Sequence, residues 1–316
     1  MPSISLHPIA FEHDIARLAE LYNQVEAKPS TVEVLRERED NQPAGILRQR
    51  LGARDDSGLL VGISEASHGA WEVAGLWHIQ VIVDVAFRNT GIGARLYEAA
   101  LQVAREQGAT TIKGVVRDNQ PADLAFAKRR GFVVDRHIFE STLDLATFDE
   151  KRFAGIVQKV QAGGIELFSF ADIEETTKAR QNVYDLNEVL MRDIPGWDAT
   201  FPPFEDFERF YFGGSHYRPD GLIIAADAHR WIGVAAHSFM QPTNSLHNLM
   251  TGVIREYRGR QVALALKLVG ITCARHFGAR SMRTNNDSQN GPMLAINHKL
   301  GYKPGPGLYT LLLALG

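Results

Sequence analysis

The chain has 316 residues, of which 45% are hydrophobic and 22% charged, a composition typical of an ordinary globular protein of about two domains. The formal net charge of −3 gives no reason to expect nucleic acid or an anionic membrane as a partner. The single cysteine excludes an intrachain disulfide, and neither a secretory signal nor an apolar run of ~18 residues is present, so we expect a cytoplasmic protein.

The first 83 residues alternate between strand and helix patterns. The segment 14–26 carries apolar residues at helical spacing, with Asp14 as the expected cap. Pro43 closes a charged helical segment, and the turn Asp55 to Gly58 joins two strands. The expected elements are a strand at 3–9, helices at 14–26 and 31–41, strands at 46–53 and 59–66, and a central strand at 71–83.

The stretch from Val81 to Gly108 is the most informative part of the chain. A β-branched strand at 76–83 leads into the tight turn RNTGIG, residues 88–93, and a helix starts inside that turn. The first N–H groups of a helix have no intrahelical partner, and the helix dipole adds partial positive charge. Since Gly91 and Gly93 lack a Cβ, a diphosphate can approach the backbone closely. We therefore expect an anion site at this turn.

The spacing of the glycines distinguishes between the known phosphate-binding loops. A dinucleotide fingerprint needs a third glycine where Leu96 stands, and a Walker loop needs Gly-Lys-Ser/Thr, which is absent. The pattern R-x-x-G-x-G after a strand resembles the acetyl-CoA pyrophosphate loop of the GNAT N-acetyltransferase superfamily; the alternative is an ordinary glycine turn. The resemblance covers 76–132 and implies acetyl-CoA as the cofactor. It also implies an α/β fold with a mixed, mostly antiparallel twisted sheet flanked by helices.

The remaining segments continue the same order of elements. They are a strand at 111–116, a helix at 118–130 with Pro121 near its start, a strand or hairpin at 133–145, a charged helical segment at 147–164, a strand at 165–169 and a helix at 172–192.

A second copy of the loop region follows at an offset of 170 residues. Val83 falls on Val253, Arg88 on Arg258 and Phe132 on Tyr302, with no gap over about fifty residues. We therefore predict two tandem GNAT-like domains. These are an N-terminal domain (1–146) with an intact loop, a helical linker (147–164) and a C-terminal domain (165–316) with a degenerate loop.

The two loops differ where the diphosphate is expected. Gln261 replaces the first glycine of the motif, and its side chain either obstructs the diphosphate or forces a strained turn. Contacts from two arginines to the phosphates would partly compensate, but we place acetyl-CoA mainly in the N-terminal domain. On the resemblance, the expected cofactor-binding residues are Val81, Ile82, Val83, Arg88, Asn89, Thr90, Gly91, Ile92, Gly93, Ala94, Asn119 and Phe126 in the first copy, and Val253, Arg258, Gly259, Arg260, Ala263 and Asn290 in the second.

Acyl transfer needs a base for the amine and an acid for the thiolate. In the family the acid, often a tyrosine, lies four residues before the glycine that ends the last helix; Ala127 and Asn297 occupy that place here, and Asn297 can donate a hydrogen bond but no titrating proton. His78 is the candidate base, and the alternative is a hydrogen-bonded histidine on a sheet face. His247 is a weaker candidate, Cys273 is expected to be a buried thiol, and no cluster has metal-ligand spacing.

Residues over the expected cleft carry the information on the acceptor. The segment 185–214 is rich in aromatics, proline and acids, and two interpretations of it are open. One is an acidic and aromatic rim for an ammonium group (Asp193, Trp197, Asp198, Glu205, Asp206), and the other is a packed cap between the domains. We predict a monomeric or homodimeric N-acetyltransferase acting on a small-molecule amine. The alternatives are a non-catalytic acyl-CoA binding protein, or an enzyme whose chemistry lies in the C-terminal half.

Overall fold

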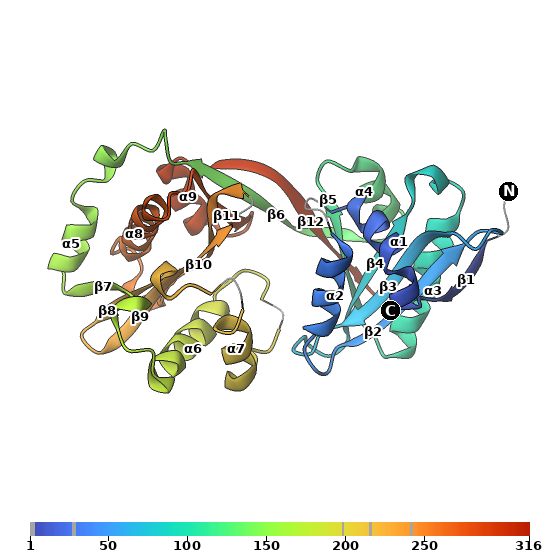
Figure 1. The fold of residues 1–316 in the computed structure, drawn as a ribbon, viewed down its shortest axis with the longest axis horizontal. Helices are drawn as coiled ribbons and strands as arrows, with labels where there is room; N and C mark the ends of the chain where they lie inside the picture. Colours follow the sequence, from blue (N-terminus) through green and yellow to red (C-terminus); the bar gives the residue numbers. More distant parts are fainter. Residues whose placement is uncertain (1–3, 27–29, 198, 215–216, 241–242) are drawn as a thin grey trace.

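The computed structural model describes residues 4–26, 30–197, 199–214, 217–240 and 243–316. Its strands form one mixed 12-stranded sheet in the order β1-β2-β3-β4-β5-β12-β6-β11-β10-β9-β8-β7. Figure 1 shows two lobes joined by the long strands β6 and β12. The strands are β1 (Ser5–Pro8), β2 (Leu47–Arg54), β3 (Leu60–His68), β4 (Leu76–Val83), β5 (Thr111–Arg117), β6 (Val133–Asp144), β7 (Ile165–Ser169), β8 (Leu222–Asp227), β9 (Arg230–Met240), β10 (Ser245–Val253), β11 (Ser281–Asp287) and β12 (Lys303–Ala314). The helices are α1 (Phe11–Asn23), α2 (Val32–Asp40), α3 (Ile92–Glu106), α4 (Pro121–Lys128), α5 (Ile156–Ala162), α6 (Thr177–Met191), α7 (Phe204–Tyr211), α8 (Val262–His276) and α9 (Gly291–Leu300).

The last strands of the two repeats are exchanged across the middle of the sheet. β12, the end of the second repeat, lies between β5 and β6 of the first and runs antiparallel to both, with Tyr309 opposite Val116 and His137. β6 in turn pairs with β11 of the second repeat, where Asp144 lies opposite Ser281. The expected division into 1–146, 147–164 and 165–316 follows the covalent chain, whereas the hydrogen-bonded sheet runs across it.

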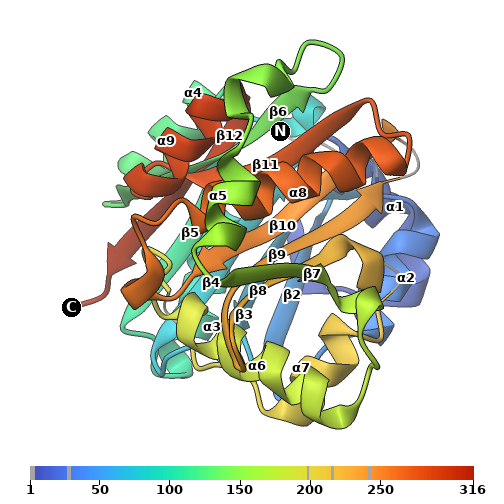
Figure 2. The same ribbon diagram turned by 90° about the vertical axis from the view of Figure 1, so that its left-hand side faces the viewer.

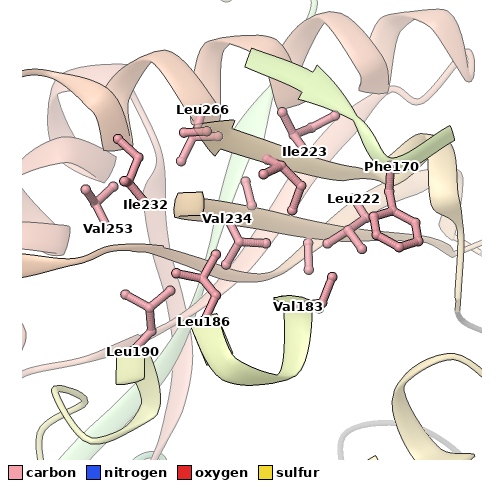
Figure 3. Packing of buried hydrophobic residues seen from close by; sticks show 14 of the residues in the cluster. Phe170, Val183, Leu186, Leu190, Leu222, Ile223, Ile232, Val234, Val253 and Leu266 are labelled. Carbon is pink, nitrogen blue, oxygen red and sulfur yellow. The ribbon is translucent and has the colours of Figure 1, made fainter. Parts of the chain in front are cut away.

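Helices cover both faces of the sheet in each lobe, as the view in Figure 2 also shows. On β4, Ile82 packs against α1 and α2, whereas Trp77 and Ile79 face α3. In the second lobe, Val183 of α6 and Leu266 of α8 lie on opposite sides of the strands (Figure 3). The only parallel neighbours among the described strands are β4 with β5 and β10 with β11. The predicted fold class, tandem mixed and mostly antiparallel sheets flanked by helices, is confirmed.

The start of α1 differs from the expected one. The helix begins at Phe11, and Asp14 is its buried fourth residue rather than its cap. The Asp14 carboxylate accepts the Ala10 N–H at 3.0 Å and pairs with Arg54 at 2.7 Å. A carboxylate inside the helix therefore accepts the main-chain N–H of the residue just before the first turn. The pattern of apolar residues does not reveal this.

Two other boundaries also differ. The central strand begins at Leu76 because residues 69–75 form a loop, in which the Glu72 carboxylate accepts the Gly69 N–H at 2.7 Å. Helix α6 begins at Thr177 after Thr176, whose hydroxyl accepts the Ala179 N–H. Helix α5 covers only part of the expected helical linker.

Within the described ranges, no helix is long and apolar enough to cross a membrane. The same residues contain no group of three or more histidine, cysteine or acidic side chains that could hold a metal ion.

Candidate active site

The turn between β4 and α3 has the backbone of an anion site. Gly91 has a φ of 87° and Asn89 a φ of 64°, both in the left-handed region. The first intrahelical bond runs from Arg95 N to Gly91 O at 3.2 Å, so the N–H groups of residues 92–94 lie ahead of the hydrogen-bond ladder. A Cβ added at Gly91 would meet no described heavy atom within 4 Å. Main-chain donors thus face open space in front of the helix, as diphosphate binding requires.

Two side chains hold this turn in place. The Nε of Arg88 donates to Val83 O at 3.1 Å, and the Thr90 hydroxyl donates to Phe87 O at 2.6 Å. The arginine of the motif therefore ties the end of β4 to the start of the loop, which stabilises the unusual backbone.

The second loop keeps the same backbone with the residue types reversed. Gly259 has a φ of 77° where the first copy has asparagine, and Gln261 has a φ of 66° where it has glycine. The Nε of Arg258 donates to Val253 O at 3.0 Å, as its counterpart does. A non-glycine residue in this region costs about 1 kcal/mol. Of the two outcomes expected at Gln261, the strained turn is therefore present. The second loop also carries the Gln261 side chain where the first loop has Gly91.

The arginines of the second loop already have partners. Asp193, just beyond α6, accepts hydrogen bonds from Arg258 and, at 2.8 Å, from Arg255. These two guanidinium groups lower the pKa of the Asp193 carboxyl. The guanidinium of Arg260 lies over the Tyr257 ring, 4.8 Å from its centroid. The expected compensation by Arg258 and Arg260 therefore requires that these contacts be exchanged for contacts to phosphate.

The parallel strands β4 and β5 separate beside the first loop. Their pairing covers only 76–78 with 111–113, whereas β4 continues to Val83 along β3. The edge of Val81, Ile82 and Val83 that faces away from β3 has no strand partner among the described residues. This is where the resemblance places the acetyl carbonyl against a main-chain N–H.

Helix α4 closes the other side of the loop. The Phe126 ring lies 3.6 Å from a Cβ built on Gly93, and it meets the Tyr97 ring edge-on at a centroid distance of 6.3 Å. The Arg130 guanidinium carbon lies 3.5 Å from the Phe126 ring centroid. Asn119 is an exposed turn residue just before α4. Phe126 thus lies between the core and the loop, whereas Asn119 lies at its outer edge.

His78 lies where β4 and β5 begin to separate, on the face covered by α1 and α2. Its Nε2 hydrogen bonds with Oε1 of Glu72, and its side chain is 33% exposed. Lys113 of β5 is its register partner. The two interpretations of His78 in the sequence are therefore compatible, because a hydrogen-bonded histidine on the sheet face here also borders the gap between β4 and β5.

The second repeat places His247 in the same position. Its register partner on β11 is Arg283, which corresponds to Lys113 at the offset of 170. His247 corresponds to His78 at an offset of 169, because β10 contains a β-bulge between Asn248 and Met250. The extra residue shifts the first part of β10 by one position, so the offset of 170, which holds from Val83 onward, does not extend to this part of the strand.

Behind the bulge, the face toward α8 is polar where the first repeat is apolar. Asn248 is 1% exposed and accepts a hydrogen bond from Lys267 Nζ at 2.7 Å. Thr284 donates to Asn248 O at 3.1 Å, and Asn286 donates to the Ser141 hydroxyl at 2.7 Å. The corresponding interior of the first lobe is formed by aromatic and aliphatic side chains.

Asn297 belongs to this polar network. It is 3% exposed, donates to Asn286 Oδ1 at 2.6 Å, and its own Oδ1 has no partner among the described residues. Asn290 lies at the start of α9, where its side chain accepts the Met293 N–H at 3.2 Å. The structure therefore gives Asn297 a place in the strand gap of the second lobe and gives Asn290 the role of a helix cap.

The segment 185–214 forms a packed cap rather than an acidic rim. Tyr184, Phe201 and Phe207 pack ring against ring at centroid distances of 5.1–5.6 Å. Asp193 and Asp206 are paired with arginines, Glu205 is exposed, and Asp198 lies outside the described residues. Trp197 packs toward Phe201.

The sequence interpretation missed Glu72, Lys113, Asn248 and Lys267. Glu72 precedes the strand in a segment that was predicted to be strand, so its contact with His78 had no local signal. Lys267 stands at an apolar helical position, and this exception to the pattern was the available signal.

The comparisons with known proteins agree with this geometry. A model of the acetyltransferase (GNAT) family matches residues 13–132. A GCN5-related N-acetyltransferase from Sphaerobacter thermophilus is 16% identical over 98% of this chain and 95% of that one, with a TM-score of 0.69. A tandem GNAT protein from the clavulanic acid biosynthesis pathway, solved without acetyl-CoA, is 19% identical over 99% of both chains, with a TM-score of 0.70.

A third similar structure is the GCN5-related glucosamine N-acetyltransferase region of a fungal multi-domain GH3 β-N-acetylglucosaminidase. It is 17% identical over 99% of this chain and 38% of that one, with a TM-score of 0.75. No curated protein matches the chain significantly. At these identities the structural likenesses show the fold, and the family model identifies the first repeat. Residues 13–132 therefore belong to the GNAT family of acetyltransferases, which supports an acyltransferase, and the whole chain has the fold of a tandem GNAT protein.

Proposed function

We propose that this protein is an acetyl-CoA-dependent N-acetyltransferase that acetylates a primary amine of a small molecule and binds the cofactor mainly in its first repeat. The observation that carries the proposal is the turn at 88–94. It combines free main-chain donors, open space at Gly91 and a strand gap that starts directly beside it.

The residues of the first lobe fit acetyl-CoA. The N–H groups of residues 92–94 would hold the diphosphate, and the free edge of 81–83 would receive the pantetheine arm and the acetyl carbonyl. When bound, acetyl-CoA supplies the activated acetyl group. His78 would take the proton of the attacking amine, because imidazole titrates near neutral pH. Ala127 offers no acid, so the coenzyme A thiolate would take its proton from water or from the imidazolium that forms when His78 deprotonates the amine.

A second candidate places the chemistry in the second lobe, and the network around Lys267 favours it. Lys267 is 2% exposed, and burial lowers its pKa to about 7. An amine that is partly neutral at physiological pH can accept a proton. The bulge in β10 also interrupts the ladder beside the strand gap, as such irregularities often do near active sites. In this case Gln261 would have to move aside for the cofactor.

Calorimetry with coenzyme A tests the proposal. We expect one tight site per chain, abolished by Gly91→Glu, since this change puts a carboxylate where the diphosphate lies. The matched change Gln261→Glu in the second loop is expected to leave binding nearly unchanged. Two equal sites, or one site lost only with Gln261→Glu, would contradict the assignment to the first repeat.

Turnover separates an enzyme from a binding protein. We would measure the release of free thiol from acetyl-CoA across a broad panel of primary amines. Tight cofactor binding without amine-dependent thiol release would favour the non-catalytic acyl-CoA binding protein.

A further inference from the structure

We propose that Glu72 is a positioning residue that fixes the proton of His78 on Nε2 and so presents Nδ1 as the basic atom, and that the second lobe holds the loop carrying Glu72 in place. This inference rests on the proposed function for its catalytic meaning. Its structural part can be tested without turnover.

The hydrogen bonds of the Glu72 carboxylate determine the tautomer. Its Oε2 accepts the Gly69 N–H at 2.7 Å, and its Oε1 bonds with Nε2 of His78. An ionised carboxylate has only acceptors, so the Nε2 of His78 must be the donor. Neutral imidazole carries one proton, and this leaves the lone pair on Nδ1. An amine that approaches His78 would therefore deliver its proton to Nδ1.

The surrounding charges keep Glu72 ionised. Burial raises the pKa of its carboxyl, but the hydrogen bonds from His78 and Gly69 and the charge of Lys113 outweigh burial and lower it. The other carboxylate on this face of β3, Glu65, is neutralised by Arg50, with a distance of 2.6 Å between Nε and Oε2. Arg48, opposite Ser67 on this face, pairs with Glu39 at 2.7 Å, and the register partner of His78 on β5 is Lys113.

The second lobe contacts the loop 69–75 directly. Glu72 forms an isolated antiparallel bridge with Ala199, and the Thr200 N–H donates to Trp71 O at 2.6 Å. The Trp71 ring meets the ring of Phe210, from α7, edge-on at a centroid distance of 5.9 Å. These contacts hold the backbone on both sides of the Glu72 carboxylate. The second repeat therefore supports the loop that carries Glu72, and through it the candidate base of the first repeat.

Nitrogen NMR of the imidazole of His78 tests the positioning. The signal would be assigned by its loss in His78→Gln, and the two ring nitrogens report the tautomer. In the wild-type protein above the titration range, we expect the Nε2–H form. In Glu72→Leu, which removes the acceptor, we expect a mixture with the Nδ1–H form. The control is Glu150→Leu, which removes a carboxylate that pairs with Arg275 at 2.6 Å in the linker, and it should leave the His78 signal unchanged.

Kinetics test the consequence. Glu72→Leu is expected to lower kcat about 100-fold with little change in the KM for acetyl-CoA, because the general base loses its orientation. In Glu72→Gln the amide has a single acceptor oxygen for two donors, the Gly69 N–H and the Nε2–H of His78. It no longer fixes the proton on Nε2, so it should also give a mixture of tautomers and lower kcat. This variant also serves if Glu72→Leu does not fold.

The outcomes separate the two proposals. An unchanged tautomer in Glu72→Leu would overturn the positioning role. A changed tautomer with unchanged kcat would show that His78 is not the base and would overturn the catalytic part. If no amine supports turnover in the wild type but the tautomer changes as expected, the proposed function fails while the hydrogen-bond assignment stands.

Discussion

The buried lysine of the second lobe predicts an unusual dependence of stability on pH. Lys267 is 2% exposed, its Nζ lies 2.7 Å from Asn248 Oδ1, and it stands 5.4 Å from the centroid of the Tyr302 ring. Burial lowers its pKa from 10.5 to about 7. Between these two values the unfolded chain binds more protons than the folded one, so the free energy of unfolding rises with pH. Below about pH 7 both states are protonated and the dependence ends.

The size of the effect follows from this difference in pKa. From pH 7 to pH 9 the wild-type protein should gain about 2 kcal/mol of unfolding free energy from Lys267, at about 1.4 kcal/mol per unit of pH once the folded lysine is neutral. Lys267→Met removes the titration and keeps much of the apolar stem. We therefore expect the free energy of unfolding of the wild type to rise by this amount relative to that of Lys267→Met between pH 7 and pH 9.

Urea unfolding at pH 7, 8 and 9 measures this difference. Lys299→Met, at an exposed position on α9, is the control and should follow the wild type at every pH. Titration of other groups, such as Cys273, cancels in the comparison because it is common to all three proteins. If wild type and Lys267→Met gain stability in parallel from pH 7 to pH 9, Lys267 is charged in the folded state and the argument from burial is wrong.

Two further predictions concern the junction of the lobes. Arg136 is 8% exposed and donates to Asp287 at 3.1 Å and to Gly196 O at 3.2 Å. Arg136→Met leaves the Asp287 carboxylate unpaired and should lower the free energy of unfolding in urea by about 3 kcal/mol, whereas Arg192→Met breaks an exposed pair with Glu188 and should change it by less than about 1 kcal/mol. Equal losses in the two variants would contradict a stabilising role of Arg136 at the junction. A fragment of residues 1–146 lacks β12 and therefore exposes the edges of β5 and β6. It should aggregate, as measured by size-exclusion chromatography. A monodisperse, cooperatively folded fragment would show that the exchanged strand β12 is not needed for the first lobe to fold.

Local patterns predicted much of the first lobe because its key feature is local. The strand, the glycine turn and the helix at 76–106 are close in sequence, and their hydrogen bonds form within that stretch. The same holds for Gln261, where one of the two expected outcomes was a strained turn and the structure has a left-handed backbone. The start of α1 was wrong because the buried Asp14 pairs with Arg54, forty residues away.

The positions of His78 and His247 show a limit of predictions from local sequence patterns. Extended backward to His78, the offset of 170 would give Asn248, whereas the register of the sheet places His247 there. A bulge adds one residue to a strand without changing its composition, so the sequence of β10 carries no clear sign of it. Every residue before the bulge then faces the other side of the sheet.

The sequence alone predicts the two repeats, their fold class and the glycine turn between strand and helix in the first repeat. These depend on periodicity and on the glycines of one short segment. Only the tertiary structure decided that β6 and β12 change places, that Glu72 meets His78, and that the acids near α6 are neutralised by arginines. Such contacts join residues far apart in the chain. They depend on which strand edges and side chains meet once the sheet has formed, and no local pattern records that choice.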